Sequence, residues 1–124
     1  LLRREQYRRA DDPTSATALA RAFVAGKLAN TRHVLRRAAR ESSPDPAALE
    51  RAADLIAHRL RALAGAPDLA TVRGLEGEAA AQYFAIFAQL VAQQREHFPF
   101  GDRNRRPPTD PINALLSYLY TLLR

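Results

Sequence analysis

The sequence predicts an all-α fold: a compact bundle of about four to six helices around a central buried helix. Two observations lead to this prediction. No segment shows sustained period-two alternation, and the helix formers Ala, Leu, Arg, Glu and Gln dominate the chain. In addition, Asp12-Pro13, Asp45-Pro46 and Asp110-Pro111 each place a helix-capping side chain before a first-turn proline.

These pairs divide the first half of the chain into its expected elements. Residues 1–10 read as a short helix or the end of one. A long helix should span about 13–41, because apolar residues recur there at helical spacing until the break at 42–44. The second Asp-Pro pair then opens a helix over about 46–64.

The second half begins with a turn at 65–68. A short helical segment follows, and Gly74 is predicted to mark its junction with the central helix, which should end near Gln94. Residues 95–110 contain Gly, three prolines and four arginines, which is typical of a loop. The last helix should begin at Pro111.

Length and composition restrict the class of protein. The 124 residues suffice for a single helical domain, 1–124, and the absence of Cys excludes disulfides and thiolate metal sites. The net charge of +6 favours an anionic partner such as nucleic acid. No signal-peptide pattern or membrane-length apolar run occurs, so we expect a cytoplasmic protein that does not bind a membrane.

Glu76 is the most informative residue. Drawn as a helix, the segment around it has one apolar face, made of Leu75, Ala79, Ala80, Tyr83, Ile86, Phe87, Leu90 and Val91. Glu76 points into the middle of this face and Glu78 points away from it. Because an inward carboxylate is costly unless it is paired, we predict a cationic partner for Glu76, with a metal ion as the most specific candidate. The competing explanation is a first-turn glutamate stabilised by the helix dipole.

The opposite side of the same helix carries only small residues. They are Ala81, Ala85, Ala88 and Ala92. This composition predicts that a second helix packs closely on that face as well. A helix enclosed in this way would be a rigid support for a catalytic carboxylate.

Lys27 and Asn30 lie on the apolar face of the long helix. That face consists of Ala16, Leu19, Ala20, Phe23, Val24, Leu28, Val34, Leu35 and Ala38. Lys27, the only lysine of the chain, lies near its middle and Asn30 near its edge. They either support the active site, by contacting Glu76 or a DNA phosphate, or are a snorkelling lysine and a core amide.

Two groups of polar residues near the end of the chain are candidate DNA contacts. Arg103, Arg105 and Arg106 lie in a proline-restricted loop from which they could grip phosphates, although a solvated basic loop is the plainer explanation. The last helix carries a polar stripe, which consists of Asn113, Ser117, Tyr120 and Arg124. The stripe is either an ordinary solvent face or the lining of a DNA-facing cleft, in which Tyr120 could stack on a base.

Three motifs in this order resemble one family. The first is Gly74-Leu75-Glu76-Gly77 followed by Tyr83-Phe84, and the second runs over 100–120, from the arginine loop into the last helix. The third and weaker one is 25–30 on the long helix, preceded by Gln6-Tyr7. Together they resemble the helical domain of the CRISPR-associated spacer-acquisition integrases, the Cas-one family.

The resemblance implies a specific activity. Members of that family are metal-dependent DNA endonucleases and integrases that act in CRISPR antiviral defence. They join the 3′ ends of a short spacer fragment to the repeat array by transesterification. Glu76 matches the family's metal-binding glutamate, and the ion would be Mg²⁺ or Mn²⁺. The other two family ligands, a His and an Asp, would follow Arg124 on later helices.

The resemblance also implies partners and a domain arrangement. The partners are DNA and the smaller Cas-two protein, which bridges homodimers of the family. The chain matches the first part of the helical domain, without the N-terminal β-rich domain and the final helices. Because the family dimer uses that β-rich domain, the sequence does not predict that this chain dimerises. With one metal ligand we expect it to be nearly inactive by itself. The alternative is a non-catalytic helical module that binds nucleic acid or a protein partner through its basic surface.

Overall fold

The computed structural model describes residues 1–41 and 44–123, and every regular element within them is helical. The expected break at Ser42-Ser43 and the expected stripe residue Arg124 lie outside the described residues. The helices are α1 (Leu2–Asp11), α2 (Pro13–Glu41), α3 (Pro46–Leu63), α4 (Leu69–Ala85), the 3₁₀ helix η1 (Phe87–Leu90) and α5 (Pro111–Leu122). The predicted all-α fold is therefore confirmed.

Aspartate caps set the helix starts. The Asp45 carboxylate accepts from the Ala48 amide at 2.9 Å, and Asp68 accepts from the Thr71 amide at 2.7 Å. Both bonds satisfy a backbone donor that has no partner within its helix. Asp12 and Asp110 cap α2 and α5 in the same way. The three Asp-Pro pairs of the sequence are thus helix starts, as predicted.

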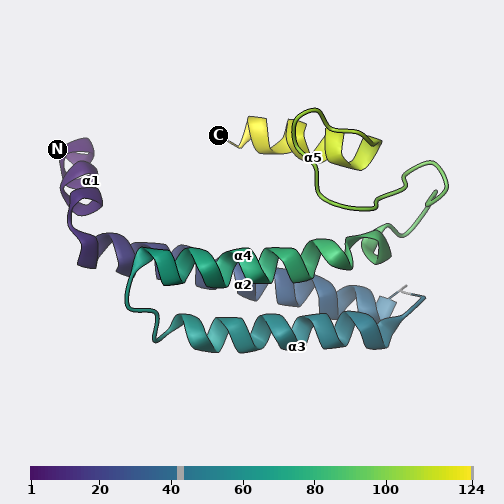
Figure 1. The fold of residues 1–124 in the computed structure, drawn as a ribbon, viewed down its shortest axis with the longest axis horizontal. Helices are drawn as coiled ribbons and strands as arrows, with labels where there is room; N and C mark the ends of the chain where they lie inside the picture. The colour runs from purple at the N-terminus through teal and green to yellow at the C-terminus, as the bar shows by residue number, and fades with distance from the viewer. Residues whose placement is uncertain (42–43, 124) are drawn as a thin grey trace.

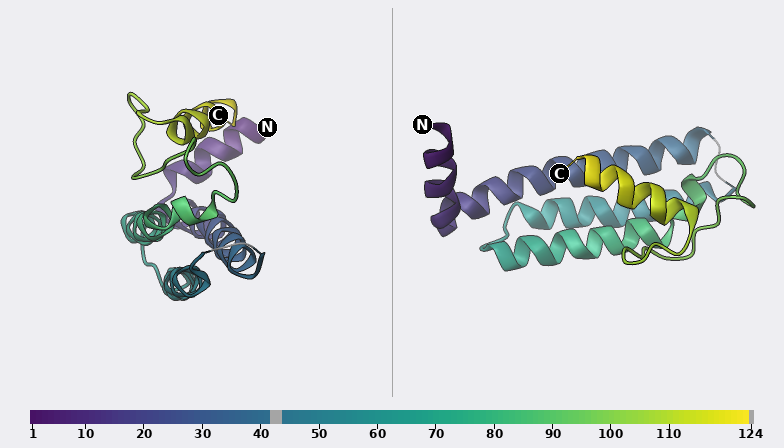
Figure 2. Two further views of the ribbon diagram at one scale, coloured as in Figure 1. Left: turned by 90° about the vertical axis from the view of Figure 1, so that its right-hand side faces the viewer. Right: turned by 90° about the horizontal axis from the view of Figure 1, so that it is seen from above.

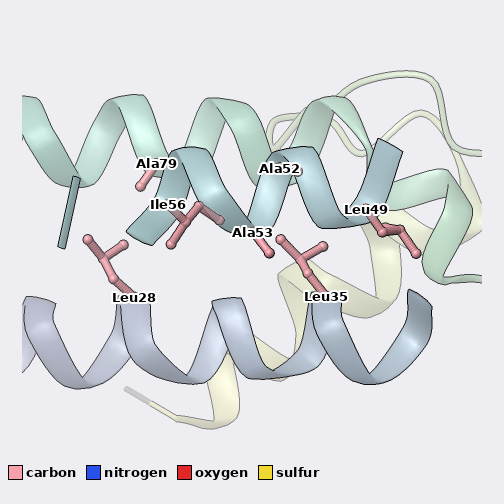
Figure 3. Packing of buried hydrophobic residues seen from close by; sticks show 7 residues of the cluster. All are labelled: Leu28, Leu35, Leu49, Ala52, Ala53, Ile56 and Ala79. Carbon is pink, nitrogen blue, oxygen red and sulfur yellow. The ribbon is translucent and has the colours of Figure 1, made fainter. Parts of the chain in front are cut away.

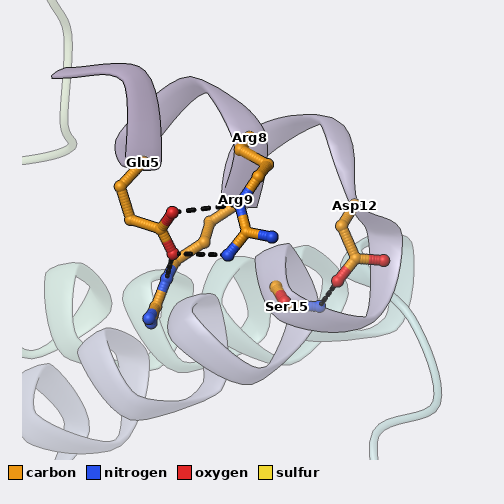
Figure 4. A network of polar contacts seen from close by, with 5 residues as sticks. All are labelled: Glu5, Arg8, Arg9, Asp12 and Ser15. Carbon is orange, nitrogen blue, oxygen red and sulfur yellow. Dashed lines mark hydrogen bonds and ion pairs between the residues drawn. The ribbon is translucent and has the colours of Figure 1, made fainter. Parts of the chain in front are cut away.

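At the junction of α1 and α2 the backbone bends away from the helical conformation. Asp12 has φ −91° and ψ 111°, as expected for a residue before proline. Its carboxylate caps α2 at Ser15, while Glu5 binds Arg8 and Arg9 on the outside of α1 (Figure 4). As a result α1 turns away from the bundle at one end instead of extending α2 (Figure 1).

The bundle proper consists of α2, α3 and α4. Viewed end-on, these three helices form a triangle, with α5 above it (Figure 2). The core lies between them and is built from Leu28, Leu35, Leu49, Ala52, Ala53, Ile56 and Ala79 (Figure 3). A second buried cluster of Leu63, Ala66 and Val72 closes the end near the α3–α4 turn.

The central segment differs from its prediction at two points. It is one helix from Leu69 with no junction at Gly74, and it ends at Ala85 instead of near Gln94. Gly74 is tolerated inside a helix at a cost of about 1 kcal/mol, and the real start signal is the Asp68 cap. At Ile86 (φ −109°, ψ 1°) the chain leaves the α conformation and enters η1.

The alanine face of α4 is also unlike its prediction. α4 packs against both α2 and α3, in line with a central helix, and Val72 and Ala79 are its buried residues. However, Ala81 and Ala85 are exposed, as are Ala88 and Ala92 beyond the end of α4. The prediction that a second helix covers this face is wrong for the described part of the chain.

The core packing predicts that alanine substitutions at two neighbouring positions of α3 differ greatly in their effect on stability. Ile56→Ala should lower the free energy of unfolding by about 2–5 kcal/mol, because a fully buried side chain leaves a cavity. Leu55→Ala, at an exposed position on the same helix, should cost clearly less. Urea unfolding followed by circular dichroism measures both, and equal losses would contradict this assignment of the core.

Candidate active site

Glu76 and Lys27 meet across the α2–α4 interface. The Lys27 Nζ donates to Glu76 Oε1, joining residues that are 49 positions apart in the sequence. The Glu76 side chain is 31% exposed and that of Lys27 is 52% exposed, so the pair lies at the surface edge of the interface. The predicted cationic partner of Glu76 is therefore present in the chain itself.

Glu78 has a different environment. Its carboxylate forms an ion pair with Arg59 of α3 at 2.5 Å and is 56% exposed. Glu76 thus faces α2 and Glu78 faces α3, in agreement with their predicted opposite directions. This separation makes Glu78 a natural reference for any effect assigned to Glu76.

A cleft of about 400 Å³ adjoins the Lys27–Glu76 pair. It is lined by Ala20, Phe23, Val24 and Lys27 of α2 and by Leu69, Val72, Arg73 and Glu76 of α4. The prediction that Phe23 belongs to the buried face of α2 is wrong, since Phe23 is 77% exposed. Burial on α2 is restricted to Thr17, Leu28 and Leu35 because only this narrower stripe faces the other helices.

A second cleft, the middle cleft, has a volume of about 320 Å³. Lys27 and Asn30 of α2 line it, together with Tyr83 and Phe84 of α4 and Tyr120 of α5. Burial raises the pKa of the Tyr83 hydroxyl, and the nearby Tyr120 adds to this shift. The hydroxyl therefore stays protonated at neutral pH and is available as a hydrogen-bond donor.

The loop arginines gather at a third cleft of about 620 Å³. It is lined by Arg103, Arg105, Arg106, Ser117, Tyr120, Thr121 and Leu123, which includes five of the residues predicted to bind DNA. Arg105 and Arg106 are exposed, whereas Arg103 and Ser117 are half-buried. The Ser117 hydroxyl oxygen is buried and has no hydrogen-bond partner among the described residues.

Shared residues connect the three clefts. Tyr120 lines both the arginine cleft and the middle cleft, and Lys27 lines both the middle cleft and the one at Glu76. Residues predicted separately from a loop and three helices thus line three clefts that adjoin one another through shared residues. Figure 2 shows α5 crossing above these helices.

Asn113 does not belong to this surface, and its prediction as a DNA contact is wrong. It is 0% exposed, and its side chain accepts from Arg103 Nη1 at 2.7 Å and from the Asn104 amide at 3.1 Å. Its Nδ2 donates to the Asp102 carbonyl at 2.8 Å and to Asp110 Oδ2 at 2.5 Å. These bonds satisfy the whole side chain and fasten the loop to the start of α5.

Arg103 has a positioning role in addition to lining the arginine cleft. Its guanidinium lies 6.0 Å from the centre of the Phe84 ring and 5.8 Å from that of Tyr120, within the range of cation–π contacts. Below it, Phe84, Phe87 and Phe100 pack ring against ring. This cluster was not predicted from the sequence, although Phe100, like Phe98, is a large apolar residue in a loop rich in charged residues and could have signalled it.

The chain offers only part of a metal site. Glu76 supplies a carboxylate beside an open cleft, which fits one oxygen ligand of Mg²⁺ or Mn²⁺. Among the described residues no group of three or more His, Cys, Asp or Glu side chains comes together. A complete site at Glu76 would therefore need ligands from outside these residues.

A comparison with known families decides the relationship. The family model described as CRISPR associated protein Cas1 matches residues 1–124, the whole chain. The chain belongs to the Cas1 family. This confirms the resemblance based on the Gly74–Gly77 motif and the arginine loop. No helix in the described part of the chain combines the length and apolarity that a bilayer span requires.

Curated Cas1 proteins are similar over nearly all of this chain. The CRISPR-associated endonuclease Cas1 1 of Moorella thermoacetica is 49% identical over 98% of the chain and 36% of its own length. The Cas1 2 endonuclease of Rhodospirillum rubrum is 46% identical over 99% of the chain and 37% of its own length. A Cas4/Cas1 fusion of Geobacter sulfurreducens is 39% identical over 95% of the chain. The chain thus spans about a third of the length of the first two relatives.

The Asp110 cap predicts a pH-dependent local structure. Hydrogen bonds from Asn113, from its side chain and its backbone, hold the pKa of Asp110 below the ordinary carboxyl value. The capping contribution is therefore complete above that value and is lost as the pH falls through the lowered pKa. We expect the NMR signal of the Asn113 amide to shift toward that of an uncapped helix below about pH 4.

Asp110→Asn is the matched variant, because asparagine keeps a capping oxygen but does not titrate in this range. Its Asn113 amide signal should stay constant over the same interval. A wild-type signal that is equally constant would contradict the assigned cap.

Proposed function

We propose that this chain forms part of a metal-dependent DNA endonuclease and integrase that acts in CRISPR spacer acquisition. The observation that carries the proposal is the succession of three adjoining clefts that are lined by the loop arginines, Tyr120, Lys27 and Glu76. Membership of the Cas1 family and the endonuclease names of its relatives support the same reaction class.

The proposed chemistry is transesterification at a DNA phosphate. A 3′ hydroxyl oxygen forms a new bond to phosphorus while the 3′ oxygen of the cut strand leaves with a proton. The number of phosphodiester bonds is unchanged, so no external energy source is needed. A bound Mg²⁺ or Mn²⁺ would stabilise the negative charge that builds up on the phosphate oxygens.

Glu76 would contribute one metal ligand, and Lys27 would act beside it. In the structure the Lys27 ammonium fixes the direction of the Glu76 carboxylate across the interface. With DNA in place the same ammonium lies where the middle cleft meets the Glu76 cleft, so it can contact a phosphate. Asn30, exposed one turn further along α2, would support the strand in the middle cleft.

The arginine cleft would position the DNA backbone. Arg105 and Arg106 are exposed and flanked by Pro107, so their guanidinium groups are free to bind phosphate oxygens. Tyr120 offers a ring for stacking or a hydroxyl for a phosphate, and Ser117 lines the same cleft with its hydroxyl oxygen buried. Arg103 would hold Tyr120 in place.

The proposed partners are the spacer DNA fragment, the repeat array and the Cas-two protein. Homodimers bridged by Cas-two belong to the same proposal for the whole protein. By itself the 124-residue chain is proposed to bind DNA without cutting it, because one carboxylate holds Mg²⁺ weakly. The alternative function, a non-catalytic nucleic-acid module, is favoured only by the lack of a three-ligand group among the described residues.

Glu76 is tested in a chimera in which residues 1–124 replace the matched segment of the Moorella thermoacetica relative. We expect Mn²⁺-dependent DNA nicking that Glu76→Gln lowers by roughly 100-fold or more, as when a group that stabilises transition-state charge is removed. Glu78→Gln, two residues away on the same helix, should retain activity. Gel assays of nicked plasmid measure the rates, and circular dichroism checks that each chimera is folded.

Two outcomes would contradict the proposal. The first is a folded chimera in which Glu76→Gln and Glu78→Gln are equally active. The second is robust Mg²⁺-dependent nicking by the 124-residue chain alone that Glu76→Gln abolishes, because the chain would then need no further ligands.

The arginine cleft is tested through the salt dependence of DNA binding. Arg105→Ala and Arg106→Ala should each reduce the slope of log K against log salt by about 0.7–0.9, one phosphate contact each. Arg37→Ala removes the same charge from the far end of α2, where Arg37 pairs with Glu41 at 3.0 Å. Fluorescence anisotropy over a salt series should show little change of slope for Arg37→Ala, and an equal change for all three would refute a specific arginine cleft.

A further inference from the structure

The aromatic ring of Phe23 is exposed to solvent beside the proposed catalytic carboxylate. Its side chain is 77% exposed, although the same helix buries Leu28 and Leu35 almost completely. Leu19 and Leu69 are also exposed on the two helices that border its cleft. Exposed apolar groups that gather at one cleft mark an interaction site more often than a solvent face.

The cleft at Phe23 combines an apolar wall with a charged end. Phe23, Leu69 and Val72 form apolar lining, while Lys27, Arg73 and Glu76 bring charges to the same space. Glu76 pairs with Lys27, and Arg73 forms no ion pair within the described residues. The cleft therefore offers a flat ring and an unused guanidinium together.

We propose that this cleft binds one nucleotide of the DNA next to the phosphate that reacts, with Phe23 stacking on the base and Arg73 binding its phosphate. This inference rests on the proposed function, because it uses Glu76 to locate the reacting phosphate. A nucleotide joins a flat ring to an anion in one unit, which matches the ring and guanidinium of the cleft. An apolar protein segment would leave the guanidinium without a partner.

The spacing of the residues fits this assignment. Phe23 precedes Lys27 by four positions on α2, and Arg73 precedes Glu76 by three on α4. Each pair thus lies about one helical turn apart, at about 6.0 Å along the axis of α2 and about 4.5 Å along that of α4. That offset is comparable to a nucleotide step, about 3.4 Å in a stacked strand. The subsite would hold the nucleotide adjacent to the Lys27–Glu76 pair, on the side away from Tyr120.

The chain has no tryptophan, which allows a direct test. Phe23→Trp introduces a single indole whose emission is quenched when a nucleobase stacks on it. We expect saturable quenching when the 124-residue chain is titrated with a short single-stranded oligonucleotide in EDTA. Tyr118→Trp places the indole on α5 at a position that is 61% exposed and lines none of the three clefts. Its emission should change little.

A second pair of variants measures affinity. Phe23→Leu keeps an apolar side chain but removes the ring, and it should weaken binding of the oligonucleotide about five-fold or more, with Phe23→Trp restoring it. Thermal unfolding should be nearly unchanged, because the replaced side chain is exposed. Arg73→Gln should weaken binding and lower its salt dependence.

The proposal is overturned if the Phe23→Trp emission is not quenched while the oligonucleotide binds, or if Phe23→Leu binds it as tightly as the wild type. Either result would instead favour a protein segment as the binding partner of the exposed Phe23 ring. Because these titrations contain no divalent metal, their failure would leave the Glu76 chimera experiment unaffected. Loss of Glu76-dependent nicking would likewise not alter the stacking signal.

Discussion

The close packing of α2 against α4 is the constraint on which the site depends. Lys27 and Glu76 meet only because the two helices lie side by side in one register. Small residues let the three helices of the bundle approach one another, since Ala52 and Ala53 of α3 and Ala79 of α4 are buried where they converge (Figure 3). Larger side chains at these positions would push the helices apart and separate the ion pair.

Much of the fold could be predicted because its boundaries are local. An aspartate before a proline carries its own physical reason to start a helix, and three such pairs were sufficient for α2, α3 and α5. The end of α4 could not be predicted in this way. It coincides with the packing of Phe84 and Phe87 against Phe100, a contact between segments that no helical spacing connects.

In the candidate site too, features with a local signal could be predicted and features that depend on contacts between distant segments could not. Glu76 and Lys27 were identified because each is a charged residue on an apolar face, an anomaly visible on one helix at a time. Asn113 was misassigned because a polar stripe on a helix looks the same whether it faces solvent or a neighbouring loop. Only the folded loop shows that the Asn113 side chain is hydrogen-bonded to Arg103, Asn104 and Asp110. Phe23 was assigned to the core because the width of a buried stripe depends on the neighbouring helices.

The hydrogen bonds of Asn113 have a mechanical consequence for the arginine loop. They fasten the loop to α5 itself, and Arg103 adds its contact with Tyr120 on the same helix. The loop and α5 are therefore joined to each other, while α5 itself makes few contacts with the three-helix bundle. The same loop is held on the end of α4, because Phe100 packs against Phe84 and Phe87 and the Arg103 guanidinium lies over the Phe84 ring. The separation between the arginine cleft and Glu76 is thus set by this aromatic contact of the loop, since α5 itself packs so little on the bundle.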